Sequence, residues 1–168
     1  FATAVNYSTG LGPHSVDAVD VNGDGYPDLV VGSYTGSLVS ILMNNGDGTF
    51  AAKVSYTTGT NPYGASVGDL NGDGKPDIVT ANWTSGTVSV ILNNGNGTFA
   101  TRSDYTTGTN PIATYLTDVN GDGKLDILVA NYNSNTFSVL MNNGNGTFAS
   151  KVDYVTDTNP QGITAGDY

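Results

Sequence analysis

The stretch DVNGDGYPD, residues Asp20–Asp28, returns twice with small changes, as DLNGDGKPD at Asp69–Asp77 and as DVNGDGKLD at Asp118–Asp126. The first aspartates of the three copies are 49 residues apart, and Asp167 follows at the same interval. A fixed period of this length is typical of repeat architectures such as propellers and solenoids. The chain is therefore built from a repeated unit of 49 residues.

The tripeptide GTF marks the same period, since it ends at Phe50, Phe99 and Phe148, and Phe1 has the same phase. We therefore divide the chain, residues 1–168, into repeats that belong to a single domain. The repeats are 1–49, 50–98 and 99–147, followed by a partial repeat at 148–168.

Each repeat contains apolar runs of strand length, separated by turn-forming residues. In the second repeat the expected strands are Phe50–Thr58, Tyr63–Asp69, Asp77–Asn82 and Thr87–Asn93. The sequence NNGNGT then closes a hairpin, because Asn-Gly pairs supply the positive φ that tight turns require. Four short strands per repeat, joined by short connections, predict an antiparallel blade.

The sequence therefore predicts an all-β fold made of β-propeller blades, each of four antiparallel strands. Counted along the chain, the strands begin with a fourth strand from Phe1 and continue through three full sets. They end with a first strand that reaches Tyr168. This count gives 14 strands, or about three and a half blades per chain.

Composition excludes several functions. The net charge of −10, with 5 Lys and Arg and no basic patch, excludes a nucleic-acid binder that relies on phosphate contacts. No apolar run approaches the roughly 20 residues of a membrane span, so we expect no membrane insertion. The absence of Cys excludes disulfides and thiolate metal sites.

The acidic nonapeptide has the donors of a calcium site. Ca²⁺ prefers six to eight oxygen ligands, which carboxylates, amide oxygens and a backbone carbonyl at alternate positions of a loop can supply. We expect three Ca²⁺ sites, each formed by positions 1, 3, 5, 7 (through its carbonyl) and 9. The predicted ligands are Asp20, Asn22, Asp24, Tyr26 and Asp28; Asp69, Asn71, Asp73, Lys75 and Asp77; and Asp118, Asn120, Asp122, Lys124 and Asp126.

An EF-hand begins in a similar way but needs a Glu at position 12 and flanking helices. Position 12 here is Val31, Thr80 and Val129, inside expected strands, which excludes the EF-hand. A set of Asx-Gly turns without metal is the alternative interpretation. Mg²⁺ is a weaker candidate than Ca²⁺, because it demands stricter octahedral geometry.

The segments DVNGDGYPDLVVG, DLNGDGKPDIVTA and DVNGDGKLDILVA, each followed by NNGxGTF, resemble the FG-GAP/VCBS repeats of integrin alpha-subunit-type β-propellers. The resemblance covers essentially the whole chain. It implies that the acidic loop joins the first and second strands of a blade and binds Ca²⁺. The family includes adhesion proteins, lectins and domains of carbohydrate-active enzymes, so the resemblance leaves the partner open.

Alternating strand direction places the acidic loops and the NNGNGT turns on one face of the propeller. The loops between second and third strands then share the opposite face, where aromatic rings and amides could contact a sugar or a peptide. The ligand-face candidates are Tyr34, Asn82, Trp83, Asn131, Tyr132 and Asn133. The alternative is that these rings pack between blades and the amides cap turns.

The chain has no Cys or Glu, and its one His and remaining aspartates form no catalytic pattern, so we expect no enzyme. We expect a calcium-stabilised binding or adhesion module for a protein or carbohydrate ligand. Calcium loops filled at millimolar ion suggest an extracellular or cell-surface location. The alternative is a structural repeat that self-assembles through half-blade edge strands into a closed propeller or a surface fibre.

Overall fold

The structure, a computed structural model, describes residues 3–166, which form strands and loops without a helix. This part of the chain accordingly offers no helix that could cross a membrane. The strands are β1 (Pro13–Val19), β2 (Asp28–Ser33), β3 (Leu38–Leu42), β4 (Val54–Thr57), β5 (Pro62–Gly68), β6 (Asp77–Asn82), β7 (Thr87–Ile91), β8 (Ser103–Thr106), β9 (Pro111–Thr117), β10 (Asp126–Asn131), β11 (Thr136–Leu140) and β12 (Val152–Val155).

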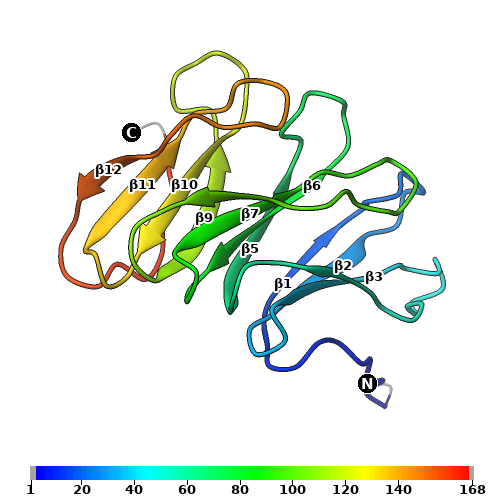
Figure 1. The fold of residues 1–168 in the computed structure, drawn as a ribbon. Helices are drawn as coiled ribbons and strands as arrows, with labels where there is room; N and C mark the ends of the chain where they lie inside the picture. The colour runs from blue at the N-terminus through cyan, green and yellow to red at the C-terminus, as the bar shows by residue number, and fades with distance from the viewer. Residues whose placement is uncertain (1–2, 167–168) are drawn as a thin grey trace.

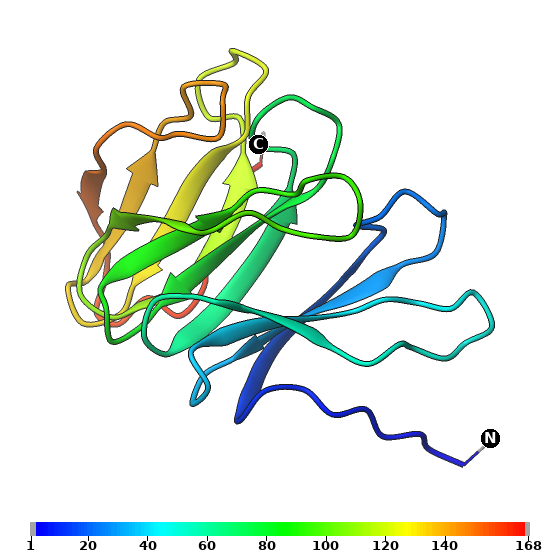
Figure 2. The same cartoon turned by 45° about the vertical axis from the view of Figure 1, so that its right-hand side comes forward.

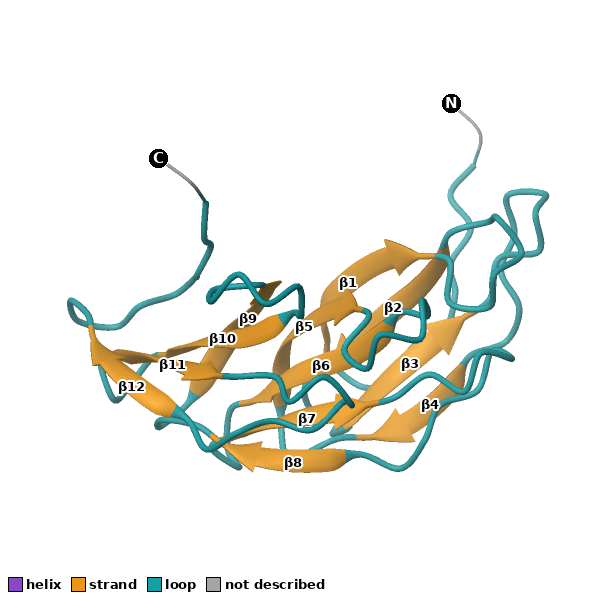
Figure 3. Ribbon diagram, turned by 90° about the horizontal axis from the view of Figure 1, so that it is seen from above, coloured by secondary structure: helices purple, strands orange, loops and turns teal. Residues whose placement is uncertain are grey.

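These strands form three antiparallel sheets of four, β1–β4, β5–β8 and β9–β12, in which each strand pairs with the next one in the chain. We call them blades 1, 2 and 3. The blades stand side by side, with β1, β5 and β9 along one margin and β4, β8 and β12 along the other (Figures 1, 2 and 3). The predicted all-β fold of four-stranded antiparallel blades is confirmed.

Each blade takes its outermost strand from the repeat that follows. Strand β4 lies in the repeat 50–98, yet Val54 and Thr57 pair with Ile41 and Leu38 of β3. Strands β8 and β12 pair with β7 and β11 in the same way. The sheets are therefore one strand out of phase with the repeats defined by the GTF tripeptide.

The two outlying strands of the 14-strand prediction do not form in the described part of the chain. Residues 3–9 and 160–166 are irregular, and Phe1, Asp167 and Tyr168, which bound those expected strands, lie outside the described residues. A strand needs a neighbour for its backbone hydrogen bonds, and among residues 3–166 neither segment has one. The described residues thus hold twelve strands in three blades.

The fourth strands are also shorter than predicted. We expected a strand over Phe50–Thr58, but β4 begins only at Val54. Phe50 instead makes an isolated bridge to Asn44, and Phe99 makes the equivalent bridge to Asn93. Phe99 leaves the sheet because its ring belongs to the core, where it is 6% exposed. Phe50 is half-buried and packs its ring edge-on against Tyr7.

The hydrophobic core lies between the blades. One cluster joins Val30 and Ile41 of blade 1 to Ile78 and Ile91 of blade 2, and a second cluster joins blade 2 to blade 3. Every residue of β6 in the middle blade is buried, and so is every residue of β10 in blade 3. Each blade therefore depends on the adjacent blade for its stability.

Candidate functional site

The loops divide between two opposite edges of the blades, as predicted. The acidic loops lie beside the turns that follow the third strands, where the backbone N–H of Asn44 donates to Asp28 Oδ1 at 2.7 Å. The loops between second and third strands lie at the other edge, beside the linkers into the next blade: the N–H of Trp83 donates to the carbonyl of Asn61 at 2.9 Å. We call these edges the acidic face and the loop face.

The first aspartate of each acidic loop organises the loop backbone. Asp20 accepts N–H groups of Gly23 and Gly25 at 2.7 Å each. These N–H donors, that of Gly25 above all, lower the pKa of Asp20, and Asp118 has its pKa lowered in the same way by its own loop. Hydrogen bonds to this carboxylate thus hold the bend of the loop.

The ninth aspartates are fully buried. Asp28, Asp77 and Asp126 have no exposed surface, and Asp77 accepts the N–H groups of Leu70 at 2.9 Å and Asn93 at 2.7 Å. Burial raises the pKa of Asp77, against those two hydrogen bonds, and the charges of the other loop acids raise it further. These carboxylates tie each acidic loop to the turn beside it.

The turns on the acidic face also join neighbouring blades. Asn93 Nδ2 donates to the carbonyl of Val21 in blade 1, and Asn142 Nδ2 donates to that of Leu70 in blade 2 at 2.9 Å. Sequence reasoning missed this role, because the adjacent pairs Asn94–Gly95 and Asn143–Gly144 already account for the turns.

The donor chemistry of the acidic loops fits a hard divalent cation, because carboxylate and amide oxygens alternate along each loop. Part of this charge is already engaged: Lys75 pairs with Asp73 at 3.3 Å and Lys124 with Asp122 at 3.0 Å. Within residues 3–166, no three His or Asp side chains converge closely enough to form a metal centre by themselves. A bound ion would therefore have to rely on the amide and backbone oxygens as well.

On the loop face, two of the predicted ligand contacts are wrong. Asn82 has no exposed surface, and its Nδ2 donates to Thr87 Oγ1 and Ser89 Oγ inside blade 2. Asn131 is equally buried and its Oδ1 accepts the N–H of Gly108 at 3.1 Å. Both amides satisfy buried polar groups, so they belong to the blade interior. Asn133 remains exposed.

The predicted aromatic residues do lie together on the loop face, as half-buried rings. Tyr63 connects them: its ring centroid is 5.9 Å from that of Tyr34 and 5.7 Å from that of Trp83. Trp83 is in turn 5.5 Å from Tyr132. His14, 3.7 Å from Tyr63, completes a row that we call the aromatic arc.

Neither Tyr63 nor His14 could be found from the repeat, because the later repeats carry Ile112 and Gln161 at this phase. The only feature of the sequence that could have indicated them is that both are aromatic residues near the start of the first strand of a blade.

Asparagines clamp the loops that carry the arc. Asn61 Nδ2 donates to the carbonyl of Tyr34, and Asn110 Nδ2 donates to that of Trp83, each at 3.0 Å. Asn159 does the same for Tyr132 at 3.1 Å. Their backbones have φ of 58°, 55° and 56°, a left-handed conformation in which Asn is among the tolerated residues.

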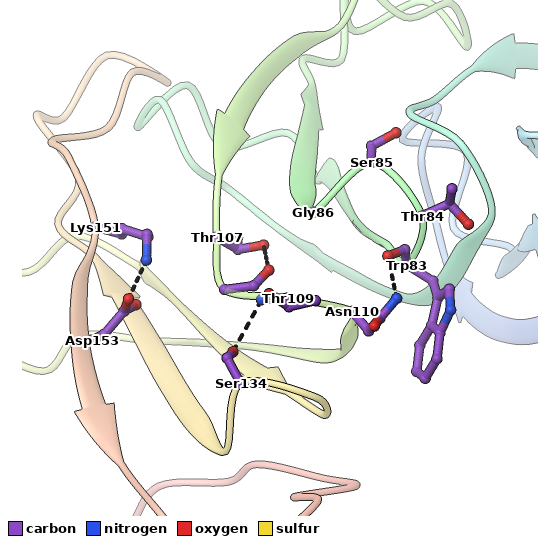
Figure 4. Close-up of a pocket in the computed structure, with 11 residues that line it drawn as sticks. Trp83, Thr84, Ser85, Gly86, Thr107, Thr109, Asn110, Ser134, Lys151 and Asp153 are labelled. Atoms are coloured by element: carbon purple, nitrogen blue, oxygen red, sulfur yellow. Dashed lines mark hydrogen bonds and ion pairs between the residues drawn. The ribbon is translucent and has the colours of Figure 1, made fainter.

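A cavity of about 520 Å³ opens beside Trp83, between blades 2 and 3 (Figure 4). Its lining is mostly hydroxyl, amide and backbone, and it runs from Trp83 and Thr84 at one end to an ion pair of Lys151 with Asp153 at the other. The indole of Trp83 lies at the edge and points away from the ion pair (Figure 4). Burial raises the pKa of Asp153, but hydrogen bonds from Lys151 and Ser138 outweigh it and leave the pKa lowered. We call this cavity the Trp83 pocket.

Comparison with a solved lectin structure supports the architecture. A lectin from Agrocybe aegerita, described as recognising non-reducing terminal N-acetylglucosamine, is 30% identical with a TM-score of 0.60. The alignment covers 84% of this chain and 38% of the lectin, so the chain spans well under half of that protein. A chain of the Photorhabdus luminescens Tc holotoxin pore is 24% identical, with a TM-score of 0.47, and the match covers 83% of this chain and 7% of that one. No curated protein matches the chain.

The family match is more extensive. The model of the FG-GAP-like repeat matches residues 20–80, 69–129 and 118–168. Each match begins at the first aspartate of an acidic loop, and the first two continue past the next loop, so the matches recur with the period found in the sequence. With three matches that together cover most of its length, the chain belongs to the FG-GAP-like repeat family.

Proposed function

We propose that this chain is a non-catalytic, calcium-stabilised binding module of the cell surface or extracellular space, and that its ligand is a carbohydrate. The observation that carries the proposal is the Trp83 pocket, a polar cavity of about 520 Å³ between two blades with Trp83 at its edge. Pockets of roughly 300–1,000 Å³ with a few placed polar groups are typical of small-ligand sites. The likeness to a lectin supports a sugar over a peptide as the occupant.

The lining suits the two kinds of surface that a sugar presents. An indole face packs against the C–H groups of a pyranose ring and keeps apolar area from water. Thr84, Thr109 and the Lys151–Asp153 pair offer donors and acceptors for hydroxyl groups. A cavity without the ring, or without the polar lining, would suit only one of these surfaces.

Calcium has a structural role in this proposal. The ligands would be the oxygens already named in the three acidic loops, and the ion would offset the repulsion among their carboxylates. Since the acidic loops lie on the face opposite the Trp83 pocket, an ion there stabilises the blades and does not contact the sugar. Loops that fill at millimolar Ca²⁺ are suited to the extracellular space.

Because the chain has one Trp, its fluorescence reports directly on the pocket. We expect titration with N-acetylglucosamine to change the emission of Trp83 in a saturable way. Loss of the indole in Trp83→Ala is expected to weaken binding, followed by calorimetry, at least tenfold, or about 1.4 kcal/mol, whereas Trp83→Phe retains most of the affinity. Tyr154→Ala, which removes an exposed ring on β12 outside the pocket, is the matched control. No saturable response to this sugar or to any sugar of a glycan array would overturn the proposal.

Self-assembly is a second candidate function, favoured by the two outer blade surfaces. Val119 of blade 3 is 42% exposed, while its equivalents Val21 and Leu70 are 2% and 1% exposed under the next blade. On blade 1, Asn44 Nδ2 donates to Pro27 of its own blade, and no neighbouring blade lies beside it among the described residues. The two surfaces are therefore complementary by repeat position.

If copies of the chain stack through these surfaces, light scattering of the purified chain shows dimers or longer species. Val119→Asp should return them to monomers, because it places a charge in the contact, while Val5→Asp, an exposed residue outside the blades, should not. A monomer at all concentrations contradicts this candidate.

A further inference from the structure

The aromatic arc continues beyond the Trp83 pocket on both sides. From Trp83 the row runs to Tyr63 at 5.7 Å and to Tyr132 at 5.5 Å between ring centroids. Tyr132 belongs to blade 3, Trp83 and Tyr63 to blade 2, and His14 and Tyr34 to the first blade. The apolar platform at the pocket is thus one part of a surface that crosses three blades.

The arc is held rigidly. The backbone N–H of Trp83 donates to Asn61, that of Tyr132 donates to Asn110, and Asn110 Nδ2 returns a hydrogen bond to the carbonyl of Trp83. Trp83 therefore stands on a loop that is held by the linkers on both sides of its blade, while Tyr63 and His14 lie in strands β5 and β1. Binding to such a platform costs little ordering entropy, since the surface is formed in advance.

Polar groups border the rings. Thr84 Oγ1 donates to Asn61 Oδ1, and Asn133 Nδ2 donates to Asn110 Oδ1, each at 2.6 Å, and both Thr84 and Asn133 are exposed. Hydroxyl and amide groups beside aromatic rings match an amphipathic chain whose C–H faces stack and whose hydroxyls point sideways. Neither Thr84 nor Asn133 carries a charge, and the net charge of −10 repels polyanions.

We propose that the aromatic arc binds the internal residues of a neutral, extended oligosaccharide whose terminal residue occupies the Trp83 pocket. This inference rests on the proposed carbohydrate-binding function and adds the class of ligand: a chain of several sugars, read along the surface. A terminal sugar in the pocket contacts one ring of the arc. A longer chain passes over Tyr132 or Tyr63 as well, and each further stacking contact adds affinity.

The test is the dependence of affinity on chain length. N-acetylglucosamine and its linear trimer and pentamer serve as neutral probes, and an oligogalacturonate of matched length as the charged one. Calorimetry of the wild type is expected to give at least a tenfold higher affinity for the trimer than for the monomer, counted per chain, and weaker binding of the charged oligomer.

Variants then locate the gain. Tyr132→Ala and Tyr63→Ala, tested separately, are each expected to reduce the ratio of trimer to monomer affinity, and Tyr132→Phe to restore it, because stacking uses the ring. Tyr154→Ala keeps the wild-type ratio. Far-UV circular dichroism and melting curves establish whether each variant is folded. If Tyr132→Ala does not fold, Tyr132→Phe still tests whether the ring alone supports binding.

The outcomes separate the two proposals. Equal affinity for monomer, trimer and pentamer overturns the role of the arc. The remaining interpretation is then a lectin that binds only the terminal sugar of an oligosaccharide. An unchanged trimer ratio in both Ala variants, with both folded, overturns it too. Absence of binding to all probes and to a glycan array overturns the carbohydrate-binding function itself.

Discussion

Asn93 Nδ2 donates a 2.8 Å hydrogen bond to the carbonyl oxygen of Val21, a residue 72 positions earlier in the chain and in the neighbouring blade. The same Nδ2 donates to Pro76 of its own blade at 3.0 Å, and Oδ1 accepts the N–H of Gly95 at 2.8 Å. One side chain thus joins its turn, its own acidic loop and that of the previous blade. The acidic loops are linked across blades through such amides.

Replacing this amide should weaken the contact between blades. Asn93 is 3% exposed, so Asn93→Ala leaves two carbonyls and an N–H without their partner. We expect a loss of about 2–4 kcal/mol in the free energy of unfolding, since each buried unsatisfied group costs roughly 1–3 kcal/mol. Urea denaturation measures it.

The adjacent Asn94 is the control for this variant. Its Nδ2 donates to Thr98 Oγ1 at the surface, and Asn94→Ala should change stability by no more than about 0.5 kcal/mol. Equal effects of the two substitutions would show that the bond between blades contributes nothing.

Calcium should stabilise the folded chain. An ion that binds only the folded state adds about 1.4 kcal/mol per site when its free concentration is ten times Kd. We expect millimolar CaCl₂ to raise the melting temperature and EGTA to reverse the change. Asp69→Asn, which alters one loop, should reduce the calcium-dependent shift, and Asp17→Asn on β1 should leave it unchanged. A melting temperature that changes with neither CaCl₂ nor EGTA contradicts the calcium proposal.

Asp47 should titrate at unusually low pH. Thr49 donates to its carboxylate through Oγ1 at 2.6 Å and through its N–H at 3.0 Å, and these bonds lower the pKa of Asp47 below the ordinary 3.8. Because the folded pKa is depressed, this interaction stabilises the fold above pH 3.8 and is lost as the pH falls through the folded pKa.

NMR titration of the carboxyl carbon measures this pKa directly. Thr49→Val, which removes the hydroxyl donor and keeps the N–H, should move the pKa of Asp47 back toward 3.8. Asp47→Asn should fold normally, since Asn96 accepts the same hydrogen bond from Thr98 in the next repeat. A wild-type pKa at or above 3.8 would refute the prediction.

Gly108 should not tolerate a side chain. A Cβ built there would lie 2.6 Å from Cγ of Asn131, whose Oδ1 accepts the N–H of Gly108. Gly108→Ala must therefore displace a buried amide, at an expected cost of about 1–3 kcal/mol. Gly162→Ala, where no atom lies within 4 Å, is the control. A similar denaturation midpoint for both variants would mean that the linker moves freely.

The repeat made most of the fold predictable from sequence. A strand inferred in one repeat had to recur in the others, so Asp77–Asn82 was predicted with its bounds intact. The division into two faces followed from strand alternation alone. The fourth strand was overestimated because Phe50 and its equivalent Phe99 look like strand residues locally, while the position of Phe99 depends on the neighbouring blade.

The candidate site was predictable only in part, for the same reason. Trp83 lies on the loop face as expected, but Asn82 beside it points the other way and is covered by Gly59 of the linker. Packing between blades decides which side chains at the end of a strand are buried. The local sequence pattern does not indicate this. Tyr63 and His14 were not among the predicted ligand-face residues, because Ile112 and Gln161 stand at the same phase of the later repeats.

The one-strand offset between sheets and repeats bears on how such a chain can change length. Loss of residues 50–98 would join Thr49 to Phe99 and bring β8 against β3, which restores a four-stranded sheet. Unequal recombination anywhere within the period therefore adds or removes whole blades and never leaves an incomplete ladder. Near-identical repeats favour such exchange, so the number of inter-blade pockets is a quantity that can vary between close relatives while every blade stays intact.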